Sequence, residues 1–142
     1  MKIVVLYGEN ETGKSGFLKS LKDSERIIIP RMEENHFFNV GRKHLSFLMK
    51  ELALEHQDLG FENFDSFMSE DSILLFLKEA INKKHETQII YLETRTELPI
   101  SLLGRLIGNG LLDPKNVFCL YFEAWKEPTK KTFDKEGFII YE

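Results

Sequence analysis

The N-terminal segment constrains the fold of this chain more strongly than any other part of it. Residues 2–7 are apolar or β-branched at nearly every position, which is typical of a strand buried on both faces of a parallel sheet. This strand runs directly into the sequence GENETGKS at residues 8–15, and Phe17, Leu18 and Leu21 then recur at helical spacing. The order predicts a strand, a tight loop and a helix whose N-terminus faces the loop.

The spacing of this loop predicts a binding site for phosphate groups. A protein holds several adjacent negative charges by directing many N–H donors at them, and the G-x-x-x-x-G-K-S spacing supplies main-chain amides, an ammonium group and a hydroxyl. Lys14 is expected to reach the outer phosphate oxygens and Ser15 to bind Mg²⁺, while the following helix presents its positive N-terminal end. The residues expected to bind the ligand are Gly8, Asn10, Glu11, Thr12, Gly13, Lys14, Ser15 and Gly16.

The sequence GENETGKS resembles the Walker A element of the P-loop NTPase superfamily. The resemblance covers the first strand and the first helix, and it implies a nucleotide-binding fold that holds ATP or GTP with Mg²⁺. Glu9 and Glu11 are unusual in such a loop, because a carboxylate beside phosphate is unfavourable unless it points to solvent. The Walker A element does not distinguish the bases, but no Asn-Lys-x-Asp guanine-reading sequence occurs in the chain, so ATP is favoured over GTP.

Alternating strand and helix patterns predict an α/β fold over residues 1–142. A chain of 142 residues with 42% hydrophobic residues suits one core, so we expect a single domain: a three-layer α/β/α sandwich with a mostly parallel sheet of about five strands, the P-loop NTPase fold. The segment 57–69 fits no single element, and 123–135 is interpreted as a loop. Further strands are predicted at 26–30, 87–93, 116–122 and 137–141, and helices at 40–56, 71–84 and from 99 to 108 or 110.

The predicted strand at residues 87–93 ends in Glu93, the second candidate site residue. P-loop NTPases share a second motif of four apolar residues ending in an acid that holds Mg²⁺ through water, and the sequence IIYLE is similar to it. Since a further predicted strand comes between the two motifs, the order resembles the RecA-like and AAA-like division, which inserts an extra strand there. That division usually has an aspartate followed by a catalytic glutamate, whereas here Thr94 follows Glu93, so one of the two acids is missing. The resemblance implies that Lys14 and Glu93 serve catalysis and that Ser15 and Glu93 bind the metal.

Three functions are open on this basis. The first is a Mg²⁺-dependent ATPase whose nucleotide state is coupled to a partner: a homo-oligomer, another protein or a nucleic acid. The second is a small nucleotide or metabolite kinase, since Glu93-Thr94-Arg95 is loosely similar to the acid-plus-arginine pairs of such enzymes. The third is a regulatory module that binds nucleotide without efficient hydrolysis, which is consistent with the incomplete acid pair.

Other charged residues fit either a functional role or an ordinary surface position. Arg95 and Arg105 fit a role in stabilising transferred phosphate. Glu123 follows a predicted strand, near the position where related proteins carry a sensor of the terminal phosphate. Lysines interleaved with Trp125 and Phe133 fit a hairpin that contacts nucleic acid, but nearby acids favour a solvated hairpin. These lysines are Lys126, Lys130, Lys131 and Lys135.

Composition excludes several classes of protein. The formal net charge of −4 gives no general attraction to nucleic acid. The only cysteine, Cys119, lies in an apolar run, which indicates a buried thiol and excludes a disulfide framework. The apolar N-terminal run is too short for a secretory signal, and no segment reaches the roughly 20 apolar residues that span a bilayer, so we expect a cytoplasmic protein without membrane contact. The four histidines, His36, His44, His56 and His85, lack the spacing of a zinc site.

Overall fold

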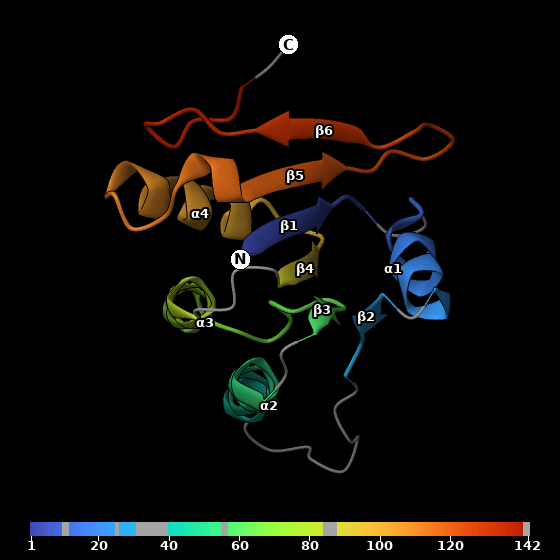
Figure 1. Cartoon of the computed structure of the whole chain (residues 1–142), viewed down its shortest axis with the longest axis horizontal. Helices are drawn as coiled ribbons and strands as arrows, with labels where there is room; N and C mark the ends of the chain where they lie inside the picture. Colours follow the sequence, from blue (N-terminus) through green and yellow to red (C-terminus); the bar gives the residue numbers. More distant parts are fainter. Residues whose placement is uncertain (10–11, 25, 31–39, 55–56, 84–87, 141–142) are drawn as a thin grey trace.

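The structure is a computed structural model that describes residues 1–9, 12–24, 26–30, 40–54, 57–83 and 88–140 (Figure 1). Within these ranges the chain forms four α-helices, one short 3-10 helix and six strands. None of the described helices has the length and apolar character needed to cross a membrane. The elements are β1 (Lys2–Tyr7), α1 (Lys14–Asp23), β2 (Ile27–Ile28), α2 (Val40–Leu54), β3 (Asp58–Phe61), α3 (Glu70–Asn82), β4 (Ile89–Thr94), α4 (Leu98–Gly108), η1 (Pro114–Asn116), β5 (Val117–Tyr121) and β6 (Thr129–Thr132).

The six strands form one sheet in the order β2-β3-β4-β1-β5-β6. β1 pairs in parallel with β4 on one side and with β5 on the other, and β3 pairs in parallel with both β2 and β4. Only β6, among the described strands, runs antiparallel to its neighbour. The mostly parallel α/β sheet is therefore confirmed, and the expected number of about five strands is corrected to six.

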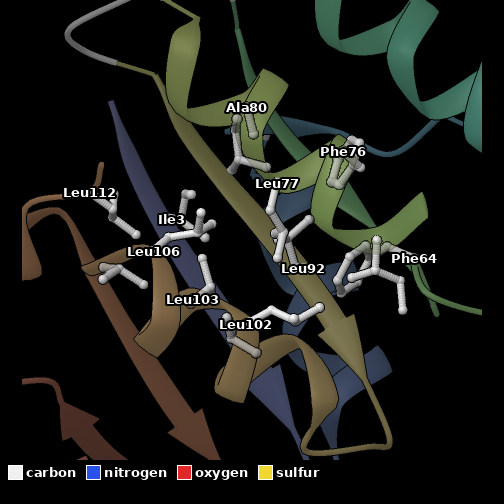
Figure 2. Packing of buried hydrophobic residues seen from close by; sticks show 14 of the residues in the cluster. Ile3, Phe64, Phe76, Leu77, Ala80, Leu92, Leu102, Leu103, Leu106 and Leu112 are labelled. Atoms are coloured by element: carbon white, nitrogen blue, oxygen red, sulfur yellow. The ribbon is translucent and has the colours of Figure 1, made fainter. Parts of the chain in front are cut away.

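Helices cover both faces of this sheet. Alternate residues of β1 point to opposite faces, as the pleat of a strand requires. Ile3 and Val5 join the larger buried cluster with residues of α2, α3 and α4, whereas Val4 and Leu6 join a second cluster with Leu18 of α1. Figure 2 shows part of the larger cluster, in which side chains of α3 and α4 pack over β1 and β4.

The segment that fitted no single element contains the buried strand β3. Leu59 and Phe61 are almost completely buried, but the strand is short and has a glycine at its centre, so its alternating pattern is hard to recognise. Neighbouring side chains pack closely on Gly60: a Cβ there would lie 2.9 Å from Cδ1 of Ile27 and 3.1 Å from Cδ2 of Leu18, so these methyl groups would have to shift. β3 thus pairs between β2 and β4, where no strand was predicted.

The predictions near the C-terminus are wrong in detail. The strand expected at residues 137–141 does not form over its described part, where Ile139 makes only an isolated bridge with Phe133. The strand β6 lies instead within the segment interpreted as a loop. Gly137 explains the difference, because its φ of 94° turns the chain away from an extended path.

Close packing of Gly104 in α4 against Gly137 makes one glycine substitution informative. A Cβ at Gly104 would lie 2.4 Å from the main-chain oxygen of Gly137, whereas a Cβ at Gly16 in α1 would meet nothing within 4 Å. Gly104→Ala is expected to lower the free energy of unfolding by about 1–3 kcal/mol through overpacking. This is the opposite of the usual effect, because alanine normally stabilises a helix relative to glycine. Gly16→Ala, the matched control, is expected to raise the free energy of unfolding by up to about 1 kcal/mol. Urea denaturation of both variants checks the packing, which an unchanged or raised stability of Gly104→Ala would contradict.

The parallel strands bring their carboxyl ends to one edge of the sheet, here called the carboxyl edge. The loop that follows β1 begins at this edge with Gly8 and leads into α1. Glu62 follows β3 at the same edge, and Glu93 lies near the end of β4. In open α/β sheets ligands bind outside the carboxyl ends of the strands. The fold therefore places the predicted phosphate loop and two acids where a ligand site is expected.

Candidate functional site

The loop between β1 and α1 (residues 8–13, the β1–α1 loop) depends on two glycines. A Cβ at Gly8 would lie 2.6 Å from the main-chain oxygen of Phe122 and 3.0 Å from Oγ1 of Thr12, so no side chain fits there. Gly13 has a φ of 100°, a left-handed conformation that residues with side chains rarely adopt. The main-chain oxygen of Gly13 accepts the first helical hydrogen bond, from Phe17 N at 3.0 Å. The loop thus turns the chain sharply from β1 into α1.

A cavity of about 320 Å³, here called the site cavity, opens at the N-terminus of α1. It is lined by polar and charged groups from α1 and from the segments that follow β3 and β4. Of the predicted ligand-binding residues, Asn10 and Glu11 lie outside the described residues and Gly8 lies at the start of the loop without lining the cavity. The lining residues are Thr12, Gly13, Lys14, Ser15, Gly16, Glu62, Asn63, Glu93 and Arg95.

Lys14 is a buried cation at the base of the site cavity, with only 4% of its surface exposed. Its Nζ donates hydrogen bonds to the main-chain oxygens of Gly8 and, at 3.2 Å, of Thr94. Burial lowers the pKa of Lys14, although the neighbouring Glu93 carboxylate partly opposes this shift. The ammonium group is therefore held between the ends of β1 and β4, at the position from which it can meet an anion.

Glu93 is a buried acid next to the hydroxyl of Ser15. Its exposed fraction is 3%, and its Oε2 accepts a hydrogen bond from Ser15 Oγ at the long distance of 3.5 Å. Burial raises the pKa of Glu93, and the charge of Lys14 acts in the opposite direction. Glu93 pairs with Leu6 across the directly neighbouring strands β1 and β4. β4 therefore lies directly beside β1 in the sheet, whereas along the chain β2 and β3 both lie between the β1–α1 loop and Glu93.

Glu62 is a second acid of the site cavity that the sequence analysis missed. It follows directly after β3 and lines the cavity, and its charge contributes to the raised pKa of Glu93. β3 is separated from β1 by β4 in the sheet. The sequence does place the apolar residues Leu59 and Phe61 just before this acid. The pattern identifies Glu62 as a strand-end acid only when the segment is known to form a strand.

Hydrogen bonds fix the segment after β3 against the segment after β4. Oδ2 of Asp65 accepts hydrogen bonds from Oγ1 of Thr94 at 2.9 Å and from Oγ1 of Thr96 at 3.0 Å. The main-chain N–H of Phe64 donates to the main-chain oxygen of Glu93 at 3.1 Å. Asn63 has a φ of 44°, which is a costly conformation for a residue with a side chain. These contacts set the position of Glu62 relative to Glu93.

The oxygen atoms around Ser15 fit a magnesium ion that is shared with phosphate. Mg²⁺ prefers oxygen ligands, keeps several waters and is often held by one or two carboxylates together with substrate phosphates. Ser15 offers a hydroxyl, and Glu93 and Glu62 offer carboxylates at the same cavity. Among the described residues no group of three or more His, Cys, Asp or Glu residues could hold a metal alone.

The remaining candidates lie apart from this group, except Arg95. Arg105 pairs with Glu70 at 3.1 Å on the surface, at one side of a larger cavity of about 790 Å³ between α4 and residues 133–139. That larger cavity is lined by neither the β1–α1 loop nor the two acids. Glu123 pairs with Lys126 at 3.1 Å and does not line the site cavity. Of the three, only Arg95 is placed to contact a ligand in the site cavity.

Cysteine and histidine supply no second site in the described part of the chain. Cys119 is completely buried, as predicted, and burial raises the pKa of its thiol to about 12. Nε2 of His44 lies 2.7 Å from the main-chain oxygen of Phe64, which is an ordinary structural hydrogen bond. The other three histidines, His36, His56 and His85, lie outside the described residues.

The raised pKa of Glu93 predicts a dependence of stability on pH. The folded protein binds this proton more tightly than the unfolded chain, so stability falls as pH rises from the ordinary glutamate pKa of 4.5 through the raised value. Glu93→Gln removes this titration, and the Tm of the variant relative to the parent is expected to be higher at neutral pH than at about pH 4. Thermal unfolding at both pH values measures the difference. Glu79→Gln, at an exposed position of α3, is the control, and a relative Tm of Glu93→Gln that falls with rising pH would contradict the burial argument.

The site cavity thus combines a buried ammonium group, a hydroxyl, main-chain amides at a helix N-terminus and two carboxylates. Cations and acids in one cavity suit a ligand that carries phosphate and a divalent cation together. Comparison of the chain with protein family models, with curated proteins and with solved structures finds no match.

Proposed function

We propose that this chain binds a nucleoside triphosphate with Mg²⁺ in the site cavity, ATP in preference to GTP, on the P-loop NTPase fold that its Walker A resemblance implies. The observation that carries the proposal is the convergence of the Lys14 ammonium and the Ser15 hydroxyl on one cavity at the N-terminus of α1. A helix N-terminus and a cation together are the usual means of holding phosphate.

The size of the cavity supports a phosphate chain as the part of the ligand that lies inside. Sites for whole small molecules usually have volumes of roughly 300–1,000 Å³. The site cavity, with about 320 Å³, is at the lower end of this range, and its lining is polar. The phosphates and the metal would fill it, and the nucleoside would lie outside its mouth.

The two acids support hydrolysis over binding alone. In our proposal Glu93, which accepts the hydrogen bond of Ser15, helps to hold Mg²⁺, and the ion would neutralise charge on the phosphates when bound. Glu62 lines the same cavity and is exposed to solvent, so its carboxylate can accept a proton from an attacking water. Arg95 is placed to stabilise charge on the transferred phosphoryl group. Glu62 therefore supplies the acid that appeared to be missing from the sequence after Glu93.

A kinase remains the second candidate, because Arg95 follows the Glu93 strand and lines the cavity. The two activities differ in the acceptor of the phosphoryl group, which is water in one case and a small molecule in the other. The ATPase proposal includes a partner to which the nucleotide state is coupled, as the resemblance implies.

A turnover assay with and without candidate acceptors tests the proposal. Phosphate release from ATP and Mg²⁺ alone is the result expected of the ATPase. ATP consumption that depends on a nucleotide or metabolite acceptor would support the kinase instead. Tight binding without either reaction would support a regulatory module, and absence of ATP binding by calorimetry would contradict the nucleotide site altogether.

A further inference from the structure

The connection between β5 and β6 brings an aromatic side chain to the carboxyl edge. β5 runs parallel to β1, and Phe122 N donates to the main-chain oxygen of Tyr7 at 2.8 Å. Phe122 then contacts Gly8 of the β1–α1 loop. Figure 1 shows this connection extending past the same edge of the sheet from which the chain enters α1. Trp125 follows three residues after Phe122, so their Cα atoms are at most roughly 11 Å apart.

Trp125 has a conformation and an exposure that folding does not explain. Its side chain is fully exposed, at 102% of the reference surface, and its φ is 65°. The left-handed region is unfavourable for a residue with a bulky side chain, and glycine or asparagine is the usual choice in such a turn. The turn is closed by Glu123 and Lys126, whose side chains form an ion pair at 3.1 Å. The chain therefore holds a large flat ring in solvent in a defined turn.

The position of the acids determines where a nucleoside would leave the site cavity. Glu62, Asn63, Glu93 and Arg95 all belong to the side of β1 on which β4 and β3 lie. In our proposal, the terminal phosphate and the metal lie at these groups and the nucleoside extends toward β5. None of the described residues that line the cavity is aromatic, so a stacking partner among the described residues would lie outside it.

We propose that Trp125 is the stacking platform for the base of the bound nucleotide, a purine nucleoside triphosphate. This inference rests on the proposed function and assigns the part of the ligand that the phosphate loop does not contact. An exposed indole ring offers a flat face to any base and gives stacking without strict base selection. It accounts for the exposure of Trp125 in the connection that follows Phe122.

The chain is suited to a direct test, because Trp125 is its only tryptophan. Tryptophan fluorescence, excited at a wavelength that the four tyrosines do not absorb, therefore reports on this ring alone. Titration with Mg²⁺ and ATP is expected to quench the fluorescence, because the base would stack on the indole. Inorganic tripolyphosphate with Mg²⁺ carries the same phosphates without a base, and it is expected to bind by calorimetry while leaving the fluorescence unchanged.

Variants measured by calorimetry separate stacking from phosphate binding. Trp125→Ala is expected to weaken ATP binding about tenfold and to leave tripolyphosphate binding unchanged, and Trp125→Phe is expected to retain most of the ATP affinity. Phe67→Ala is the matched control, because Phe67 is also exposed, at 79%, and left-handed, with a φ of 62°, but follows β3 on the other side of β1.

The outcomes distinguish this inference from the proposed function. If ATP and tripolyphosphate bind equally well and Trp125→Ala changes neither, the phosphate site stands and the stacking platform is rejected. If Phe67→Ala weakened ATP binding and Trp125→Ala did not, the base would lie on the β3 side of β1. That result would also reject the stacking platform at Trp125. If neither ligand binds, the nucleotide site fails and the stacking platform fails with it.

Discussion

Replacing Lys14 with methionine is expected to weaken the binding of ATP and Mg²⁺ at least about 100-fold, which corresponds to roughly 3 kcal/mol. The Lys14 ammonium is the one described cation that is buried at the base of the site cavity. Its interaction with phosphate is therefore little screened by water. Methionine keeps most of the length and the apolar stem of the side chain, so the variant removes mainly the charge and its hydrogen bonds. Titration calorimetry measures the loss directly.

Lys19→Met provides the matched control for this experiment. Lys19 belongs to the same helix, but its side chain is exposed and does not line the site cavity. The control removes the same charge from α1, and its ATP affinity is expected to stay within about twofold of the parent, as for an exposed charge. Far-ultraviolet circular dichroism of both variants checks that the fold is retained. If a folded Lys14→Met variant bound ATP as tightly as Lys19→Met, Lys14 would have no role in binding.

Replacing Glu62 with glutamine is expected to slow ATP hydrolysis at least about 100-fold while ATP binding is retained, because general base catalysis usually contributes about 10²–10⁴ to the rate. Glutamine has nearly the same shape as glutamate but cannot accept a proton from water. Glu93→Gln is expected to act differently, by raising the Mg²⁺ concentration needed for half-maximal activity, since Glu93 lies beside the Ser15 hydroxyl. A phosphate-release assay over a series of Mg²⁺ concentrations separates the two effects.

Glu79→Gln serves as the control for the loss of an acid, because Glu79 is exposed on α3 and lies outside the site cavity. Its rate and Mg²⁺ dependence are expected to match those of the parent. The assignment of roles would be reversed if Glu62→Gln shifted the Mg²⁺ dependence and Glu93→Gln abolished hydrolysis. Full activity in Glu62→Gln would show that Glu62 takes no part in the reaction.

The parts of the fold that local sequence determines were predicted well. The strand β1, the turn at Gly8 and the start of α1 follow one another within a short segment, so spacing alone indicates their order. The helices α2, α3 and α4 carry regular apolar stripes, and their predicted ranges agree with the structure to within a few residues over the described chain. Both β4 and β5 are apolar runs buried in the sheet, and they were found for the same reason.

The parts that depend on distant contacts were not predicted. β6 consists of the polar sequence TKKT, and its two lysines place their ammonium groups over the rings of Phe118 and Tyr121, at 4.5 and 4.2 Å from the ring centroids. Such a strand has no apolar pattern, because its partners lie on β5. The approach of Glu62 to Glu93 likewise depends on the pairing of β3 with β4, which joins segments about 30 residues apart along the chain. The second acid of the site cavity could therefore be identified only from the sheet.

The position of the ligand is the central claim, and nuclear magnetic resonance of the nitrogen-15-labelled chain tests it most directly. Addition of ATP and Mg²⁺ is expected to cause the largest amide shifts at Gly13, Lys14, Ser15 and Gly16, whose N–H groups form the N-terminus of α1 beside the site cavity. Largest shifts around the cavity between α4 and residues 133–139, or no shifts at saturating ATP, would contradict the claim.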